Sequence, residues 1–235
     1  MTESLAIALV NPHAWEIPHE VTDHVRHVGA ELAARGHRVL VLTPSESTAR
    51  VRYGRRLVRD GGEALLARAD GEPVVVAACE DLGPVGGRRR AALPMDVTRT
   101  LTDLFDQTPL DVCHVHEPFA PSLPSAALRA SRALNVGSFH APAERLVSTQ
   151  VARRVVQLVF GRLDARTASY PATAEIMDRH FPAAYRLLSP GAPALERVPR
   201  AAGAPVRIAF VEREERSALR LLLRALRHVT AEQPW

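Results

Sequence analysis

Lysine is absent from this 235-residue chain, and all 30 of its basic residues are arginines. Aromatic residues make up only 5% of the sequence, so the chain offers few rings on which nucleic-acid bases could stack. The arginines are scattered along the chain and the formal net charge is only +4. Together these features argue against nucleic acid as a partner.

Only two cysteines occur, and both lie in strand-like apolar runs, so we interpret Cys79 and Cys113 as buried thiols. No apolar run approaches the ~18 residues of a membrane span. The N-terminus enters an apolar run within a few residues, so we expect no secretory signal. These observations predict a cytoplasmic protein.

Short apolar runs alternate with helical patterns along most of the chain. Most of the runs are continuously apolar, which is typical of parallel strands buried on both faces. The alternation predicts an α/β fold with a Rossmann-like, doubly wound parallel sheet. The predicted strands are 5–11, 37–43, 73–79, 111–116, 135–141, 168–172 and 185–190, and the predicted helices are 21–36, 94–104, 122–134, 144–163 and 173–180. Residues 45–72, rich in arginine and glycine, are expected to form an irregular surface excursion.

The last part of the chain is expected to belong to a second domain. Residues 191–205 are rich in proline, glycine and alanine and are typical of an interdomain linker after a first domain of residues 1–190. Residues 206–235 then hold one more predicted strand, 206–212, and an amphipathic helix. About 30 residues cannot bury enough surface to fold alone. We therefore expect the first βα unit of a truncated second domain, whose uncovered apolar surface favours a homo-oligomer or a partner chain.

The turn after the first predicted strand contains no glycine-rich phosphate loop. It reads IPHEVTDHV and carries His19 and Glu20 where a phosphate-binding turn usually carries glycines. The absence of G-x-G-x-x-G disfavours a bare dinucleotide-binding module. Further along, His114 and His116 share one face of a strand and precede Glu117. Two histidines and a carboxylate are a weak metal signal without a third placed ligand, so we expect no metal.

Four stretches of the sequence together resemble the family-4 glycosyltransferases of the GT-B fold, and in particular the actinobacterial phosphatidylinositol mannosyltransferases. They are ALVNPHAWEIPHEVTDHVRHVGAELAARGHRVLVLTP, DVCHVHEPFAPSL, GSFHAPAER, and HFPAAYRLLSPGAP leading to AFVEREERSALRLLLRAL. The resemblance implies that residues 1–190 form the N-terminal acceptor domain, facing a second domain that binds the nucleotide-sugar. It implies retaining hexosyl transfer from GDP-mannose or a UDP-hexose to a lipid or polyol acceptor, with no cofactor required.

The resemblance also assigns roles to individual residues. His140 matches the family's histidine beside the transferred sugar and is the candidate catalytic residue. His19 and Glu20 occupy the glycine positions of the donor-phosphate loop, Arg213 is kept from the donor clamp, and Arg216 stands for its lysine. The acceptor contacts and the residues that support them are His13, Trp15, His24, His114, His116 and Glu117.

Two hypotheses about activity stay open. Glu20 would place a negative charge near the donor diphosphate, and each such pair costs roughly 3 kcal/mol at about 5 Å. Glu20 can also be a first-turn helix residue that the helix dipole favours. The chain is thus either a glycosyltransferase that is incomplete or impaired as it stands, or a non-catalytic relative that has lost donor binding.

Arg88, Arg89 and Arg90 suit peripheral contact with the inner face of the plasma membrane, or form a solvated charge run.

Overall fold

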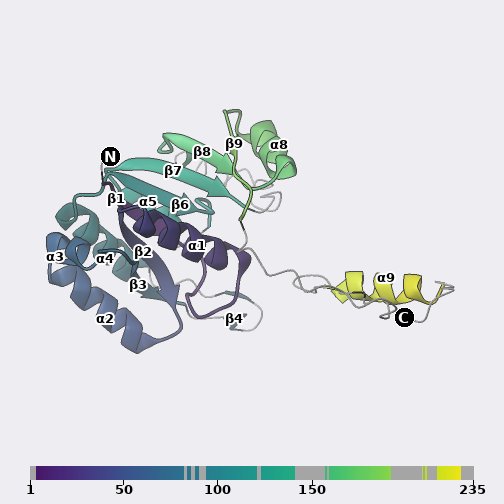
Figure 1. The fold of residues 1–235 in the computed structure, drawn as a ribbon, viewed down its shortest axis with the longest axis horizontal. Helices are drawn as coiled ribbons and strands as arrows, with labels where there is room; N and C mark the ends of the chain where they lie inside the picture. Colours follow the sequence, from purple (N-terminus) through teal and green to yellow (C-terminus); the bar gives the residue numbers. More distant parts are fainter. Residues whose placement is uncertain are drawn as a thin grey trace. The chain divides into compact units, whose positions relative to one another are not determined.

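The computed structural model describes residues 4–81, 84–85, 88–89, 94–120, 123–140, 157, 159–191, 208, 210 and 216–228. The chain divides into two compact units, residues 1–191 and 192–235. The first unit holds a seven-stranded sheet and the helices around it (Figure 1). In the described part of the second unit, helix α9 (Arg216–Leu226) exposes Leu221 and Leu223. All helices within the described ranges are too short or too polar to cross a bilayer.

The sheet is entirely parallel and has the strand order β3-β2-β1-β6-β7-β8-β9. This arrangement confirms the predicted doubly wound, Rossmann-like fold. Chain connections leave β1 toward β2 and β3 on one side, and later return to β6 and β7 on the other side. The strands are β1 (Ala6–Val10), β2 (Arg38–Ser45), β3 (Val74–Glu80), β6 (Val112–His116), β7 (Leu134–Phe139), β8 (Ala165–Ala168) and β9 (Arg186–Leu187).

Each face of the sheet is covered by its own hydrophobic cluster. Ile7 and Leu9 of β1 pack with α1 (Glu20–Ala34), whereas Ala8 and Val10 point into the larger cluster on the opposite face. Since successive side chains of a strand alternate between faces, a strand buried on both sides must be apolar throughout. The larger cluster is built with α2 (Thr48–Arg59), α3 (Gly62–Ala67), α4 (Pro94–Gln107), α5 (Leu123–Ala130) and α8 (Pro171–His180).

The prediction that residues 45–72 are irregular is wrong, because they form α2 and α3 (Figure 1). Ser47 caps α2 by accepting a hydrogen bond from the backbone of Arg50, and arginine is a good helix former. The helix buries Val51, Gly54, Leu57 and Val58 along one side. Its many arginines hid this apolar side from a sequence-based assignment.

Several predicted element bounds also change. The sixth strand is β8, residues 165–168 instead of 168–172, because Pro171 begins α8 at a position that proline favours. The helix predicted over 122–134 ends at Ala130, and Leu134 already begins β7. The helix predicted over 144–163 falls mainly outside the described residues. Of the strand predicted over 206–212, only Ile208 and Phe210 are described, and both are exposed and non-strand.

Candidate functional site

The carboxyl ends of β1, β6 and β7 meet at the point where the chain switches sides of the sheet. Asn11 follows β1, His116 ends β6, and His140 follows β7. Open α/β sheets bind ligands outside the carboxyl ends of their strands at such a switch point. Asn11 is buried, and its amide donates to the backbone oxygen of His13 and to the hydroxyls of Thr22 and Thr43, which ties the first loop to α1 and β2.

The turn before α1 is closed by its own side chains. His19 is the N-cap residue, and its Nδ1 accepts a hydrogen bond of 3.2 Å from the backbone N–H of Val21. The ring of His19 stacks on that of His13 with centroids 3.6 Å apart. Glu20 is the exposed first residue of the helix, as its interpretation as a first-turn acid predicts. One backbone donor that a phosphate could use is therefore occupied by an imidazole.

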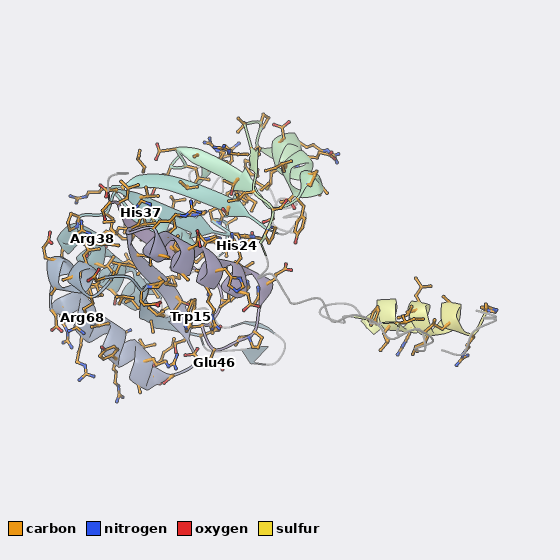
Figure 2. All side chains as sticks on the ribbon, in the orientation of Figure 1. Trp15, His24, His37, Arg38, Glu46 and Arg68 are labelled. Carbon is orange, nitrogen blue, oxygen red and sulfur yellow. The ribbon has the colours of Figure 1, made fainter. Side chains whose placement is uncertain are left out.

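Three buried histidines converge at the carboxyl edge from three different elements. His24 comes from α1 (Figure 2), His116 ends β6, and His140 follows β7. The ring centroids lie 5.6 Å apart for His24 and His116, 5.2 Å for His24 and His140, and 5.1 Å for His116 and His140. The Nδ1 atom of His116 lies 2.9 Å from Nε2 of His140, within hydrogen-bonding distance. His140 in turn places Nδ1 2.7 Å from the hydroxyl of Ser169.

Glu117 holds the backbone beside this cluster. Its Oε1 accepts a 2.7 Å hydrogen bond from the N–H of His140, and its own N–H donates to the carbonyl of Ser138. Glu117 has a φ of 49°, in the left-handed region that non-glycine residues seldom adopt. Such strain persists where surrounding contacts impose it, and here those contacts fix the position of His140.

A second series of close polar contacts joins β6, β7 and β8, beside the one that links His116, His140 and Ser169. Nε2 of His114 lies 2.6 Å from the hydroxyl of Ser138, which lies 2.5 Å from the hydroxyl of Thr167. The rings of His114 and His116 stack at 4.4 Å, which confirms that they share one face of β6. Ser138, Thr167 and Ser169 were not predicted from the sequence as site residues. Each lies on or directly after a central strand, but the displaced bounds of β8 hid the last two.

Burial keeps these imidazoles in their neutral form. It lowers the pKa of His114 to about 4 and that of His140 to about 3, with neighbouring histidines adding to the effect. The pKa of His116 is held well below its usual value, again by burial first, and that of His24 is also lowered. Among the described residues, Nε2 of His116 has no hydrogen-bond partner. A buried polar atom without a partner costs about 1–3 kcal/mol.

Trp15, labelled in Figure 2, lines a hollow that none of the three clustered histidines lines. The hollow is small, about 180 Å³, and its other lining residues are Glu16, Arg50, Tyr53 and four residues of β2 and β3. The guanidinium of Arg26 stands 4.4 Å above the Trp15 ring and donates to the Trp15 carbonyl. Of the two loop residues predicted to contact an acceptor, Trp15 thus lines this hollow, whereas His13 stacks on His19.

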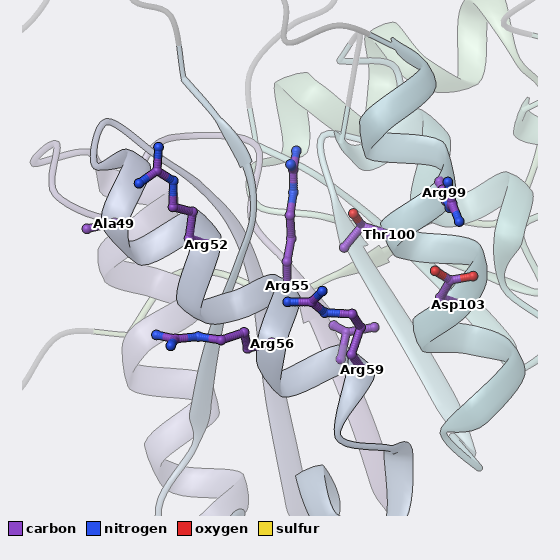
Figure 3. A pocket seen from close by; sticks show the side chains of 9 residues that line it. Ala49, Arg52, Arg55, Arg56, Arg59, Arg99, Thr100 and Asp103 are labelled. Atoms are coloured by element: carbon purple, nitrogen blue, oxygen red, sulfur yellow. The ribbon is translucent and has the colours of Figure 1, made fainter.

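A larger hollow, of about 820 Å³, lies between α2 and α4 (Figure 3). Its lining is dominated by arginines, four from α2 and one from α4, with Asp103 as the acidic member. The residues are Ala49, Arg52, Arg55, Arg56, Val58, Arg59, Arg99, Thr100 and Asp103. This basic surface was not predicted from the sequence, because the residues of α2 were expected to be irregular.

The remaining predicted site residues lie elsewhere or outside the described chain. Arg88 and Arg89 form the short strand β5 (Arg88–Arg89), which pairs with β4 (Pro84–Val85), and Arg90 lies outside the described residues. Arg213 also lies outside them, and Arg216 begins α9 in the second unit. The donor clamp and the membrane patch thus stay predictions.

The chain is similar to known glycosyltransferases. The model of Glycosyltransferase Family 4 matches residues 21–194. A phosphatidyl-myo-inositol mannosyltransferase of Propionibacterium freudenreichii is 25% identical over 175 residues, which cover 73% of this chain and 42% of that protein. The proteins of the same name from Mycolicibacterium smegmatis and Mycobacterium leprae are 25% and 28% identical, over 70% and 65% of this chain. The matches span only 36–42% of the length of these three relatives.

Proposed function

This chain belongs to glycosyltransferase family 4, and on that premise we propose that residues 1–190 form the acceptor-binding domain of a retaining hexosyltransferase. The donor is a nucleotide-sugar, GDP-mannose or a UDP-hexose, and the acceptor is a lipid or polyol such as phosphatidyl-myo-inositol. The single observation that carries the proposal is the polar edge at the sheet's switch point, where His116 ends β6 and His140 directly follows the neighbouring β7.

His140 is the residue to which we assign the transfer step. Glu117 fixes its backbone and Ser169 engages Nδ1, so the ring has a defined orientation. Its Nε2 lies against His116, and contact with a sugar or acceptor hydroxyl requires this bond to open. His24 and His114 surround the pair and keep the edge free of permanent charge.

A second candidate function is that of a non-catalytic relative that binds a ligand, a membrane surface or a partner chain. The observation that favours it is the closed turn before α1. Relatives in this family present glycine amides to the donor diphosphate, whereas here His19 caps the helix and Glu20 adds a negative charge. Both changes weaken an anion site at a helix N-terminus.

A chimera separates the two functions. Residues 1–205 are joined to the nucleotide-sugar domain of the Propionibacterium relative, and mannose transfer from GDP-mannose to phosphatidyl-myo-inositol is measured. We expect transfer, and a loss of about 100-fold or more in His140→Ala. His27→Ala, on the exposed side of α1, serves as the matched control.

Donor binding by the same chimera is measured by isothermal titration. A folded chimera that binds GDP-mannose but transfers no mannose supports the non-catalytic function. If the chimera binds no donor, the double change His19→Gly and Glu20→Gly tests the closed turn. Recovery of binding would identify these two side chains as the cause.

A further inference from the structure

The three buried histidines at the carboxyl edge have an arrangement that the proposed glycosyl transfer does not require. One ring nitrogen from each of His24, His116 and His140 lies within 4.8 Å of the other two. In the described part of the chain, this is the one group of three metal-ligating side chains that gathers so closely. The sequence pointed only to His114 and His116 as a ligand pair, and the structure instead places His24 and His140 beside His116.

We propose that His24, His116 and His140 form a binding site for a divalent transition-metal ion, with zinc as the ion of choice. Imidazole nitrogen suits zinc, and three protein ligands with a fourth position left for water or substrate are the pattern of catalytic zinc sites. The ligands come from a helix and two strand ends of one packed unit, so the fold itself brings them together.

The spacing of the ligands is close to what zinc requires. At Zn–N distances of about 2.0–2.1 Å, neighbouring nitrogens of a tetrahedral site lie about 3.4 Å apart. The present upper limit of 4.8 Å therefore needs a closure of at most about 1.4 Å, which rotations of the three rings supply. The closest pair, Nδ1 of His116 and Nε2 of His140, lies at 2.9 Å and needs to open by about 0.5 Å.

Hydrogen bonds around the cluster fit a metal ligand set. Histidine ligands commonly donate their second ring N–H to an oxygen that fixes the tautomer. Nδ1 of His140 lies 2.7 Å from the hydroxyl of Ser169, which leaves Nε2 for the ion. Ligation there replaces the hydrogen bond between the two rings and occupies the nitrogen that the proposed transfer step uses, so the ion-bound chain is not the transfer-competent form.

The second ring nitrogen of His116 is also without a partner among the described residues. His116 is fully buried, and this nitrogen is its Nε2. Buried polar atoms are almost always partnered, so an orphaned imidazole nitrogen among other imidazoles points to a group from outside the chain. Nδ1 of His116, which lies 2.9 Å from Nε2 of His140, is the nitrogen assigned to the ion, and Nε2 is left to a water or a substrate hydroxyl.

The proposal is tested by metal titration of the 235-residue chain, prepared without a histidine tag and freed of metal with a chelator. We expect one equivalent of Co²⁺ to give the visible absorption of a tetrahedral cobalt site, and Zn²⁺ to displace it. His24→Ala, His116→Ala and His140→Ala are each expected to weaken zinc binding by more than 100-fold. Ser169→Ala, which removes the oxygen beside a ligand, should weaken it by roughly 10- to 100-fold.

Two controls separate this site from weak binding by surface histidines. His27→Ala changes an exposed histidine of the same helix as His24, and His228→Ala changes an exposed histidine of the second unit. Both should keep one equivalent of zinc. Glutamine variants of the three ligands replace any alanine variant whose circular dichroism shows unfolding. A rise in Tm on adding zinc, seen in the wild type and absent in the ligand variants, is the second measurement.

Two results would overturn the proposal. One is a wild-type chain that takes up no stoichiometric zinc or cobalt after chelation. The other is a triple variant of the three ligands that is folded and binds zinc as the wild type does.

Discussion

The histidine-rich edge and the arginine-rich hollow both gather nitrogen-bearing side chains, and they do so in opposite ways. At the edge, His24, His116 and His140 are buried, lie against one another and stay neutral. In the hollow between α2 and α4, arginines that are always charged line an open space of about 820 Å³.

The difference follows from where each group stands. Strand ends and the helix beside them form the edge, so its side chains are packed and must find partners within the protein. The hollow is built on the outer sides of two helices, where long side chains keep their charged ends in water. The edge therefore suits a small ligand or ion, and the hollow suits an anionic surface.

The largest expected effect is an acid-sensitive stability that arises mainly at the edge. His114 and His140 have folded pKa values of about 4 and about 3, below the unfolded value of about 6.5. Below pH 6.5 the unfolded chain binds more protons, so folding stability is full above that pH and falls as the pH approaches 4. Each histidine contributes up to about 1.4 kcal/mol per pH unit, and urea unfolding of chelated protein from pH 7.5 to 4 should lose several kcal/mol.

His114→Gln is the variant that tests this assignment, because glutamine can still bond to Ser138 without titrating. Its stability should fall less steeply with decreasing pH, by up to about 1.4 kcal/mol per pH unit. Arg52→Ala should leave the slope unchanged, since arginine stays charged throughout. Equal slopes in the wild type and His114→Gln would contradict the buried neutral histidine.

The next effect concerns the hollow and membrane contact. Changing Arg52, Arg56 and Arg59 to alanine removes three exposed charges from α2. Each arginine near an anionic surface contributes about 1 kcal/mol to membrane binding. The triple variant should therefore bind phosphatidylserine vesicles about 3 kcal/mol, roughly 100-fold, more weakly than the wild type, as measured by sedimentation. Neutral phosphatidylcholine vesicles should bind neither protein, and added salt should reduce the difference.

A matched triple variant controls for net charge. Arg68, Arg129 and Arg179 are exposed arginines on other elements, and their change to alanine should leave vesicle binding near the wild-type level. A further arm changes Arg88, Arg89 and Arg90, the surface that the sequence suggested. If all three triple variants bind vesicles equally, the attraction reflects net charge and no particular surface.

A smaller effect concerns how closely α2, which lines the hollow, and α1, which carries His24, pack on the sheet. Gly54 of α2 packs so closely on β3 that an added Cβ would overlap the carbonyl oxygen of Ala77. Gly54→Ala should destabilise the fold by about 1–3 kcal/mol. In α1, a Cβ at Gly29 meets Leu9 and Pro73 at an ordinary 3.4 Å, so Gly29→Ala should be neutral or stabilising by up to about 1 kcal/mol. Urea unfolding measures both, and a destabilised Gly29→Ala would remove the contrast.

The sheet was predictable because its strands are buried on both faces and therefore apolar without interruption. At its carboxyl edge, the places of His116, Glu117 and His140 near strand ends were predictable, and their assignment to a site came from the family resemblance. The convergence of His24 was not, because it depends on how α1 is rotated against the sheet. Ser169 was hidden by a shifted strand boundary, and α2 by arginines that conceal its apolar side.

The smallest expected effect lies in the loop that joins the edge to the small hollow of Trp15. Arg26, on α1, stands 4.4 Å above the Trp15 ring. An exposed cation–π contact is worth about 0.5–1 kcal/mol, so Arg26→Ala should lower the free energy of unfolding by that amount. With Trp235 changed to phenylalanine, Trp15 is the sole tryptophan, and its fluorescence should shift toward that of a hydrated indole. His13 lies in the same loop as Trp15 and stacks on His19. The zinc affinity of Arg26→Ala therefore measures whether the loop around Trp15 also positions the histidine edge. Unchanged zinc affinity would show that the histidine edge is positioned independently of Trp15, whereas a weakened affinity would show that the two regions share one ordered loop.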